Sequence, residues 1–307
     1  NEHGYIQSGY RILVSSDIEK LNNENGDMWD SGKVESFQQY AVVYQGKKLS
    51  SVKKYYWKVM IFDSFGNRSD WSETASFETS IIYQSEWIAK FIGGSNVRMV
   101  RNSISVSFGK KIVSARAYVS SPGYFVFHVN GKIIGDHLLD PVQTNPDMRL
   151  LYVTFDVTGI IGSGENILGA QLGYGGICGL TGARCNVSSH RNDDGSRYFI
   201  MQLHVKYSDG TSDTFITDEN WKGITEGPII FDELYGGETY DATREVEGWD
   251  KRDFDDGSWT SVISKSIGNR IMAAQLVHIK PVEEITPIRE TYLNGKYIFD
   301  LGRNISG

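Results

Sequence analysis

Two short acidic runs carry the residue types that hold calcium in proteins. Residues 192–195 read Asn-Asp-Asp-Gly, and residues 253–257 read Asp-Phe-Asp-Asp-Gly. A calcium loop of the EF-hand type has a glutamate at its twelfth position, which binds the ion through both oxygens. That position is Leu203 in the first run and Ser264 in the second. We therefore predict that neither run is an EF-hand loop.

A glycine-rich run at residues 173–179 has nearly the spacing of a dinucleotide-binding loop. In such a loop three glycines lead into a helix whose N-terminus binds the pyrophosphate. Here the third glycine position is Cys178, and no helix-like periodicity follows it, so we predict no nucleotide cofactor.

Cys178 and Cys185 could close a small disulfide loop or remain two unpaired residues. Two thiols alone do not complete a structural zinc site.

The histidines and carboxylates show no spacing that identifies a catalytic centre. His128 and His204 lie within strand-like segments, where we expect them to be structural. The chain has 38 Asp and Glu residues, as a solvated surface would have.

Its formal net charge of −7 repels phosphate backbones, so we expect no nucleic-acid partner. No apolar run reaches the roughly 20 residues that span a bilayer, so we expect no membrane span.

The elements that carry these residues are predicted to be short β-strands. Apolar residues alternate with polar ones, or form short apolar blocks, between turn signals. In the first 82 residues this pattern predicts strands at 10–14, 41–44, 55–62 and 76–79. Trp57 lies in the third of these strands, and we expect it to pack in the core between two sheets. We predict a fibronectin-III- or immunoglobulin-like β-sandwich at residues 1–82.

Residues 83–265 are predicted to form a jelly-roll β-sandwich. Asn130-Gly131 separates two alternating segments and is the strongest short hairpin signal. Residues 266–307 carry another such signal at Asn294-Gly295, and we expect them to begin a further β-sandwich that is cut short. The chain shows no long amphipathic helix, which excludes a doubly wound sheet, a TIM barrel and a helical toroid. The predicted fold class is all-β.

Segments along nearly the whole chain match one known family in order. In the first 82 residues they are SGYRILVSS at 8–16, WDSGKVES at 29–36, KYYWKV at 54–59 and DWSETASFE at 70–78. Further along they are WIAK at 87–90, GYFVFHVNGK at 123–132, GDHLLDP at 135–141, YVTFDV at 152–157, ELYGGETYDA at 233–242, GWD at 248–250, FDDGSW at 254–259 and FDLGRNISG at 299–307. This order resembles the N-terminal half of bacterial α-L-rhamnosidases of glycoside hydrolase family 78.

The resemblance implies a non-catalytic part of a larger hydrolase. Family members remove terminal α-L-rhamnose by an inverting mechanism, in which one carboxylic acid protonates the leaving oxygen and one carboxylate activates water. Those carboxylates lie in a downstream helical barrel, so we assign no catalytic residue and expect this chain alone to be inactive. The implied partners are a rhamnose-containing saccharide or glycoside and the protein's own C-terminal catalytic domain. The implied location is secreted or periplasmic, with the cytoplasm left open.

The resemblance also implies that the jelly roll at 83–265 is of the carbohydrate-binding type, because some members use this unit as a rhamnose-binding module. It implies in turn where sugar and calcium would bind. The implied sugar-binding residues are Asn145, Asp147, Tyr174 and Asn192. The implied calcium ligands are Asn145, Asp147, Asn192, Asp193 and Asp194, and no other cofactor is expected. The loop at residues 140–149, which carries Asn145 and Asp147, departs from the family pattern, since Gln143 replaces a tryptophan and Asn145 replaces an aspartate. The alternative is that these polar residues cap their own turns.

These departures remove one stacking surface and one negative charge from the expected site. The sequence therefore favours a scaffolding role over a working sugar site. Two other functions stay open, namely a self-sufficient lectin-like protein and a structural or adhesion module in which the sandwiches act as spacers.

Overall fold

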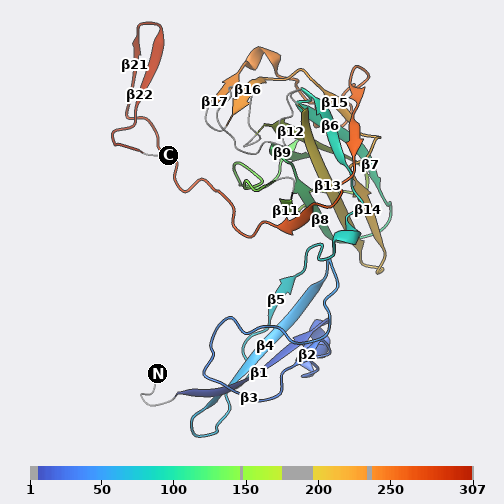
Figure 1. Cartoon of the computed structure of the whole chain (residues 1–307), viewed down its shortest axis with the longest axis vertical. Coiled ribbons are helices and arrows are strands. Elements are labelled where there is room, and N and C mark those ends of the chain that lie inside the picture. The colour runs from blue at the N-terminus through green and yellow to red at the C-terminus, as the bar shows by residue number, and fades with distance from the viewer. Residues whose placement is uncertain (1–5, 146–147, 175–195, 234–236, 306–307) are drawn as a thin grey trace. The chain divides into compact units, whose positions relative to one another are not determined.

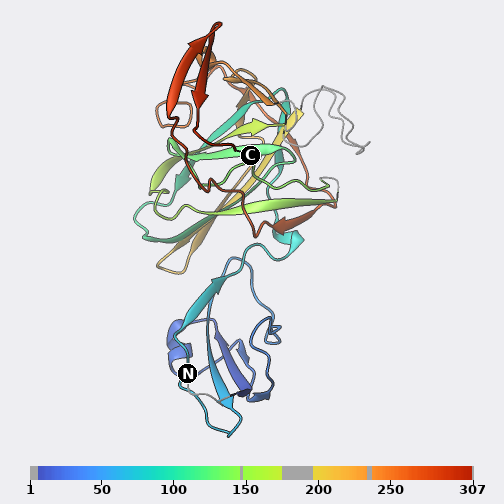
Figure 2. The ribbon, with the colours of Figure 1, turned by 90° about the vertical axis from the view of Figure 1, so that its left-hand side faces the viewer.

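A computed structural model (Figure 1) describes residues 6–145, 148–174, 196–233 and 237–305. The chain divides into two compact units, Asn1–Ile88 and Ala89–Gly307, called unit 1 and unit 2 below. In Figures 1 and 2 unit 1 runs from blue to cyan, and unit 2 from cyan to red. Among the described residues, no helix is long and apolar enough to cross a membrane. The predicted all-β fold class is confirmed.

Unit 1 is built on one antiparallel sheet with the order β2-β1-β4-β5, in which β3 also pairs with β1. The strands are β1 (Gln7–Ser15), β2 (Trp29–Asp30), β3 (Val34–Glu35), β4 (Lys54–Asp63) and β5 (Ala75–Glu78). The short helix α1 (Ile18–Asn22) follows β1 because the Asp17 carboxylate accepts hydrogen bonds from the first free N–H groups, those of Glu19 and Lys20. Its Leu21 is fully buried.

One face of this sheet is apolar along its whole length. Residues Tyr10, Ile12 and Val14 of β1 are directly paired with Ile61, Val59 and Trp57 of β4. Side chains alternate along a strand, so all six point to the same face. Trp57 is half-buried there.

The strand predicted at 41–44 does not form, and residues 36–53 contain no strand at all. Ala41 has a φ of 55°, which no extended strand adopts. The Gln38 side-chain amide donates hydrogen bonds to the Tyr40 and Ala41 carbonyls, at 3.0 and 3.1 Å. It thus occupies carbonyls that would otherwise pair with a neighbouring strand. The apolar face of the sheet is therefore covered by an irregular segment rather than by a second sheet.

Unit 2 is a sandwich of two sheets. Its described residues form a 6-stranded sheet with the order β10-β9-β12-β7-β15-β18 and a 7-stranded sheet with the order β19-β6-β13-β8-β11-β20, in which β14 pairs with β13. The first contains β7 (Met99–Val106), β9 (Tyr124–Val129), β10 (Lys132–Ile133), β12 (Gly164–Gly173), β15 (Lys222–Ile224) and β18 (Thr260–Ser261). The second contains β6 (Phe91–Ser95), β8 (Ile112–Ser120), β11 (Arg149–Asp156), β13 (Ser196–Tyr207), β14 (Ser212–Ile216), β19 (Ile263–Lys265) and β20 (Ile271–Ala274).

The core of unit 2 lies between these two sheets. Phe125 and Phe127 of β9 pack against Phe155 of β11 and Phe199 of β13, with ring centroids 5.7 to 6.3 Å apart. The predicted turn at Asn130-Gly131 joins β9 to β10, and both residues have positive φ, 51° and 78°, as a tight hairpin turn requires. Beside this turn, His128 is buried and structural as predicted, with its Nδ1 2.8 Å from an Asp250 carboxylate oxygen.

The C-terminal part of unit 2 adds two features. Strand β20 pairs in parallel with β11 and so belongs to the sandwich, although it lies beyond the boundary predicted at residue 265. A separate hairpin, β21 (Arg289–Leu293) and β22 (Lys296–Asp300), turns at Asn294-Gly295 as predicted. That this hairpin begins a third domain stays a prediction.

Candidate functional site

An open groove of about 630 Å³ lies in unit 2 over β9, β12 and the hairpin of β16 (Ile229–Glu233) and β17 (Gly237–Tyr240). Small-molecule sites commonly have volumes of about 300–1,000 Å³, so the groove could hold a sugar of one or two rings. Its described lining residues are Tyr124, Phe125, Val126, Leu138, Leu139, Gln171, Leu172, Gly173, Ile229, Asp232, Gly237 and Glu238. We call it the unit 2 groove.

The groove combines apolar and polar surface. Val126, Leu138 and Leu139 are partly exposed on it, which leaves apolar surface open to a ligand. Tyr124, Gln171 and Glu238 supply hydroxyl, amide and carboxylate groups around that surface. A pyranose ring needs both kinds of contact, because its C–H face is apolar and its edge carries hydroxyls.

Asp232 is the carboxylate that organises one end of the groove. One of its oxygens accepts a hydrogen bond from the Tyr174 backbone N–H, and the other lies 3.2 Å from Nη2 of Arg197. The Arg197 side chain is 2% exposed, and its guanidinium lies 3.8 Å from the centroid of the Tyr174 ring. Burying a cation is costly unless a charge or an aromatic face compensates it. Asp232 and Tyr174 together supply that compensation.

Arg98 fixes the strand that carries Asp232. Its guanidinium donates to the backbone carbonyls of Thr225, Ile229 and Ile230, which attaches β16 to the sandwich. Burial lowers the pKa of Arg98, and the nearby positive charge of Arg197 lowers it further. Because the guanidinium binds these backbone carbonyls, we interpret Arg98 as a residue that positions β16 and not as one that contacts a ligand.

The structure describes two of the sequence-predicted site residues. Tyr174 is buried beneath Arg197, next to the unit 2 groove. Asn145 is exposed, and its carbonyl accepts hydrogen bonds from the N–H groups of Met148 and Arg149; it is not among the described residues that line the groove. The remaining ones lie outside the described residues, namely Asp147, Asn192, Asp193 and Asp194, as do Cys178 and Cys185.

A second polar cluster lies close to the groove. Two of its residues, His137 and Asp140, directly precede and follow the groove residues Leu138 and Leu139 in the sequence. His137, Asp140 and His278 have potential ligand atoms within 4.8 Å of one another. The amide nitrogen of Gln275 lies 3.0 Å from an Asp140 oxygen and 3.1 Å from His278 Nδ1, between the two groups that a metal would join. Hydrogen bonds therefore already satisfy the cluster, and we read it as a polar clasp rather than a metal site.

The orientation of the Gln275 amide indicates the protonation state of His278. Its amide oxygen accepts from the Val142 backbone N–H at 2.8 Å, so its nitrogen must be the group that faces Asp140 and His278. His278 Nδ1 is then an acceptor, and the ring is neutral. The His137 and His278 rings stack with centroids 3.8 Å apart. Burial lowers the pKa of His278, and the neighbouring His137 lowers it further.

Sequence reasoning missed Arg98, Arg197, Asp232 and the clasp. Gln275 and Asp140 are 135 positions apart, and Arg98 reaches carbonyls more than 125 positions away. Such pairs leave no local pattern in one sequence. Only the tertiary fold brings them together.

The fold and the groove define a class, that of an immunoglobulin-like unit followed by a two-sheet sandwich with an open surface site. Residues 1–83 match the description "Rha78A-like, N-terminal immunoglobulin domain". Residues 110–284 match "Alpha-L-rhamnosidase N-terminal domain". The chain belongs to this family of α-L-rhamnosidase N-terminal domains.

Known proteins resemble the chain along its whole length. It is 35% identical to an α-L-rhamnosidase of Formosa agariphila, with 99% of this chain and 35% of that protein covered. It is 33% identical to one of Alteromonas sp., with 100% and 35% covered. The solved α-L-rhamnosidase from Dictyoglumus thermophilum has a TM-score of 0.87 and 33% identity over 99% of this chain and 35% of that one. The chain thus spans about a third of the length of the curated relatives it matches.

The fold is also shared with a more distant structure. An α-L-rhamnosidase of Streptomyces avermitilis, solved in complex with L-rhamnose, has a TM-score of 0.85 at 21% identity, covering 98% of this chain and 46% of that one. This likeness concerns the fold alone.

Proposed function

We propose that this chain is the non-catalytic N-terminal region of an α-L-rhamnosidase, where it supports the catalytic part and contacts the sugar substrate. One observation carries the proposal. The chain is similar over 98–100% of its length to three α-L-rhamnosidases, of which it covers only 34–35%. The alternatives of a stand-alone lectin or an adhesion spacer have no comparable support.

The carboxylates of the unit 2 groove also support a non-catalytic role. An inverting glycosidase needs an acid and a base roughly 6.5–9.5 Å apart across the sugar. Of the two acidic residues among the described lining, Asp232 has both oxygens engaged by Tyr174 and Arg197. Glu238 alone cannot supply both groups.

The contact with sugar is assigned to the unit 2 groove. Its exposed aliphatic side chains suit the C–H face of a pyranose, while Tyr124, Gln171 and Glu238 suit its hydroxyls. Calcium binding by Asn145, Asp147, Asn192, Asp193 and Asp194, with sugar contacts from Asn145, Asp147, Tyr174 and Asn192, remains a proposal that rests on the family resemblance. Export of the whole protein to the periplasm or the medium is likewise a proposal, which cell fractionation would test.

The test of the non-catalytic role is turnover by the purified chain. We expect no hydrolysis of an aryl α-L-rhamnoside above the buffer rate, because the described lining of the unit 2 groove holds no free carboxylate pair. The Dictyoglumus thermophilum relative is the positive control. Hydrolysis that copurifies with the chain and disappears in Glu238→Gln would contradict the proposal.

The test of the sugar role is calorimetry with L-rhamnose, with calcium and after chelation. The proposal expects binding that weakens in Tyr124→Ala, and calcium-dependent binding that weakens in Asp147→Ala. Binding unchanged by chelation and by Asp147→Ala would remove calcium from the account. No heat at millimolar sugar would remove the sugar contact and leave the scaffolding role.

A further inference from the structure

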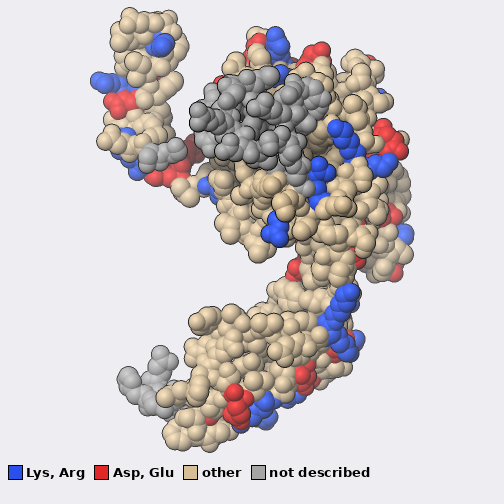
Figure 3. Space-filling model, viewed as in Figure 1, with Lys and Arg blue, Asp and Glu red and all other residues tan. Residues whose placement is uncertain are grey.

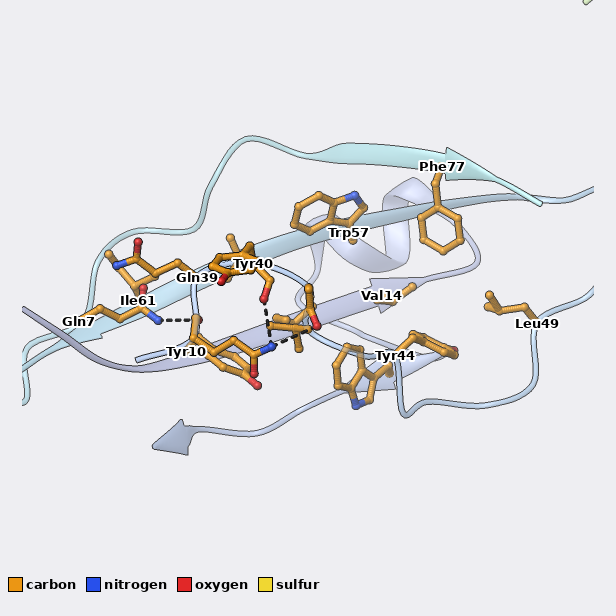
Figure 4. A pocket seen from close by; sticks show the side chains of 16 residues that line it. Gln7, Tyr10, Val14, Gln39, Tyr40, Tyr44, Leu49, Trp57, Ile61 and Phe77 are labelled. Carbon is orange, nitrogen blue, oxygen red and sulfur yellow. Dashed lines mark hydrogen bonds between the residues drawn. The ribbon is translucent and has the colours of Figure 1, made fainter. Parts of the chain in front are cut away.

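Unit 1 contains an open groove of its own, with a volume of about 480 Å³. The function proposed for the unit 2 groove does not involve it. It lies between the apolar face of the sheet and the irregular segment 36–53, and Figure 4 shows it from close by. Six aromatic residues line it, namely Tyr10, Trp29, Tyr40, Tyr44, Trp57 and Phe77. We call it the unit 1 groove.

The groove exists because the segment over the sheet is not a strand. A second sheet would bury the apolar face, as the two sheets of unit 2 bury theirs. Here Trp29 and Trp57 stay half-buried, Ile61 is exposed, and Tyr40 is 83% exposed at the edge of the groove. Aromatic surface in unit 1 is therefore open to a ligand.

The groove carries no charge. All its described lining residues are apolar, aromatic or glutamine, with no Asp, Glu, Lys or Arg among them. Figure 3 shows the same tendency on a larger scale, because the charged side chains of unit 1 gather along one edge of the visible face. A charged ligand would lose its hydration here without gaining an ion pair, so the groove fits a neutral one.

Two exposed polar groups of the groove are free to bind. Within the described residues, the hydroxyl of Tyr40 and the side-chain amide of Gln39 have no hydrogen-bond partner. The Tyr44 hydroxyl, by contrast, lies 2.7 Å from the Lys47 carbonyl and is already used. Free hydroxyl and amide groups beside aromatic rings are the donors and acceptors that sugar hydroxyls require, while the rings cover the C–H faces.

We propose that the unit 1 groove binds a neutral saccharide that carries rhamnose. Rhamnose is a 6-deoxy sugar, so its methyl group makes it more apolar than glucose or galactose and suits this lining. The choice of rhamnose among neutral sugars rests on the proposed function, whereas the choice of a neutral sugar rests on the groove itself. Unit 1 then holds a part of the substrate chain separately from the unit 2 groove.

The experiment is calorimetry on the full 307-residue chain with a neutral oligosaccharide that ends in α-L-rhamnose, and with maltohexaose as the control ligand. Tyr40→Ala is the main variant, because this exposed ring can be removed without opening the core. Phe37→Ala is its matched control, since Phe37 is 76% exposed on the same segment but outside the described lining. Tyr124→Ala removes a ring from the unit 2 groove instead.

We expect saturable binding that weakens by roughly three- to tenfold in Tyr40→Ala, the effect of losing one aromatic contact. Phe37→Ala should bind like the original chain, and maltohexaose should bind less tightly. The inference is overturned by no saturable binding, by equal affinity of Tyr40→Ala, by equal losses in Tyr40→Ala and Phe37→Ala, or by equally tight maltohexaose. Loss of binding in Tyr124→Ala alone would also overturn it, yet would support the sugar role proposed for unit 2.

Discussion

The buried pair of Arg197 and Asp232 is the most consequential single contact of the unit 2 groove. The two side chains are 2% and 14% exposed, and Nε and Nη1 of Arg197 have no hydrogen-bond partner in the described part of the chain. Asp232 is thus the sole described carboxylate that neutralises this cation. Tyr174, which the family resemblance offers as a sugar-stacking residue, has its ring occupied by Arg197.

We predict that Asp232→Asn lowers the free energy of unfolding by about 3 kcal/mol. The amide keeps the shape and can still accept from Tyr174, but it leaves the buried Arg197 without its counter-charge, with only the Tyr174 ring against it. Urea denaturation followed by tryptophan fluorescence measures the change. Glu238→Gln, an exposed acid in the same groove, should change stability by less than about 0.5 kcal/mol. Equal effects of the two variants would refute the role of the pair.

The clasp of His137, Asp140, Gln275 and His278 predicts a pH dependence of stability. The pKa of His278 is lower in the folded protein than in the unfolded chain, so the unfolded state binds more protons. Its contribution to stability is fully present above the unfolded pKa of about 6.5 and is lost as the pH falls through the folded value. Stability should therefore decrease from pH 7 to pH 5.

His278→Asn tests this prediction, because an asparagine oxygen can still accept from Gln275 but does not titrate. We expect a flatter decrease in the free energy of unfolding between pH 7 and pH 5. Some slope should remain, since burial also lowers the pKa of His128. An unchanged slope in the variant would assign the whole effect to His128 or to other groups.

At the scale of elements, strand β12 depends on a glycine at its centre. A Cβ on Gly169 would lie 2.4 Å from the Trp249 ring and 3.1 Å from the Val100 carbonyl. We predict that Gly169→Ala destabilises unit 2 by roughly 1–3 kcal/mol through this overpacking. Thermal unfolding provides the measurement. Gly159→Ala is the matched control, as its Cβ would meet no atom within 4 Å; a Gly169→Ala variant as stable as this control would show that Trp249 moves aside freely.

The elements also show what the sequence could predict. The two Asn-Gly signals predicted the turns between β9 and β10 and between β21 and β22, because these signals are local. The same alternation failed at 41–44, where Gln38 and the positive φ of Ala41 break the strand. Strand β20 lies beyond the boundary predicted at residue 265, since its parallel pairing with β11 joins segments more than a hundred residues apart and leaves no local signal.

At the scale of the whole molecule, the hairpin β21–β22 exposes both of its faces. Tyr292 and Tyr297 are each 64% exposed on one face, and Leu293 and Ile298 are 56% and 49% exposed on the other. An isolated two-stranded hairpin is marginally stable in water, so we predict fast amide hydrogen exchange at residues 289–300 in this chain. Slow exchange in the 307-residue chain would contradict this prediction.

The family could be recognised from the sequence, whereas the described grooves could not. The family was recognised from short motifs that occur along the chain in the same order as in its members. The unit 1 groove depends on a strand that does not form, and the unit 2 groove depends on the Arg98 and Arg197 contacts. Each is a property of tertiary packing that one sequence does not display.

The most direct test of the account is a chimera. This chain replaces the matching third of the Dictyoglumus thermophilum α-L-rhamnosidase, and hydrolysis of an aryl α-L-rhamnoside is measured beside the same enzyme without that third. We predict that the chimera recovers at least a substantial part of the activity that the truncated enzyme loses. A chimera that folds but is no more active than the truncated enzyme would contradict the claim that this chain serves as the N-terminal region of an α-L-rhamnosidase.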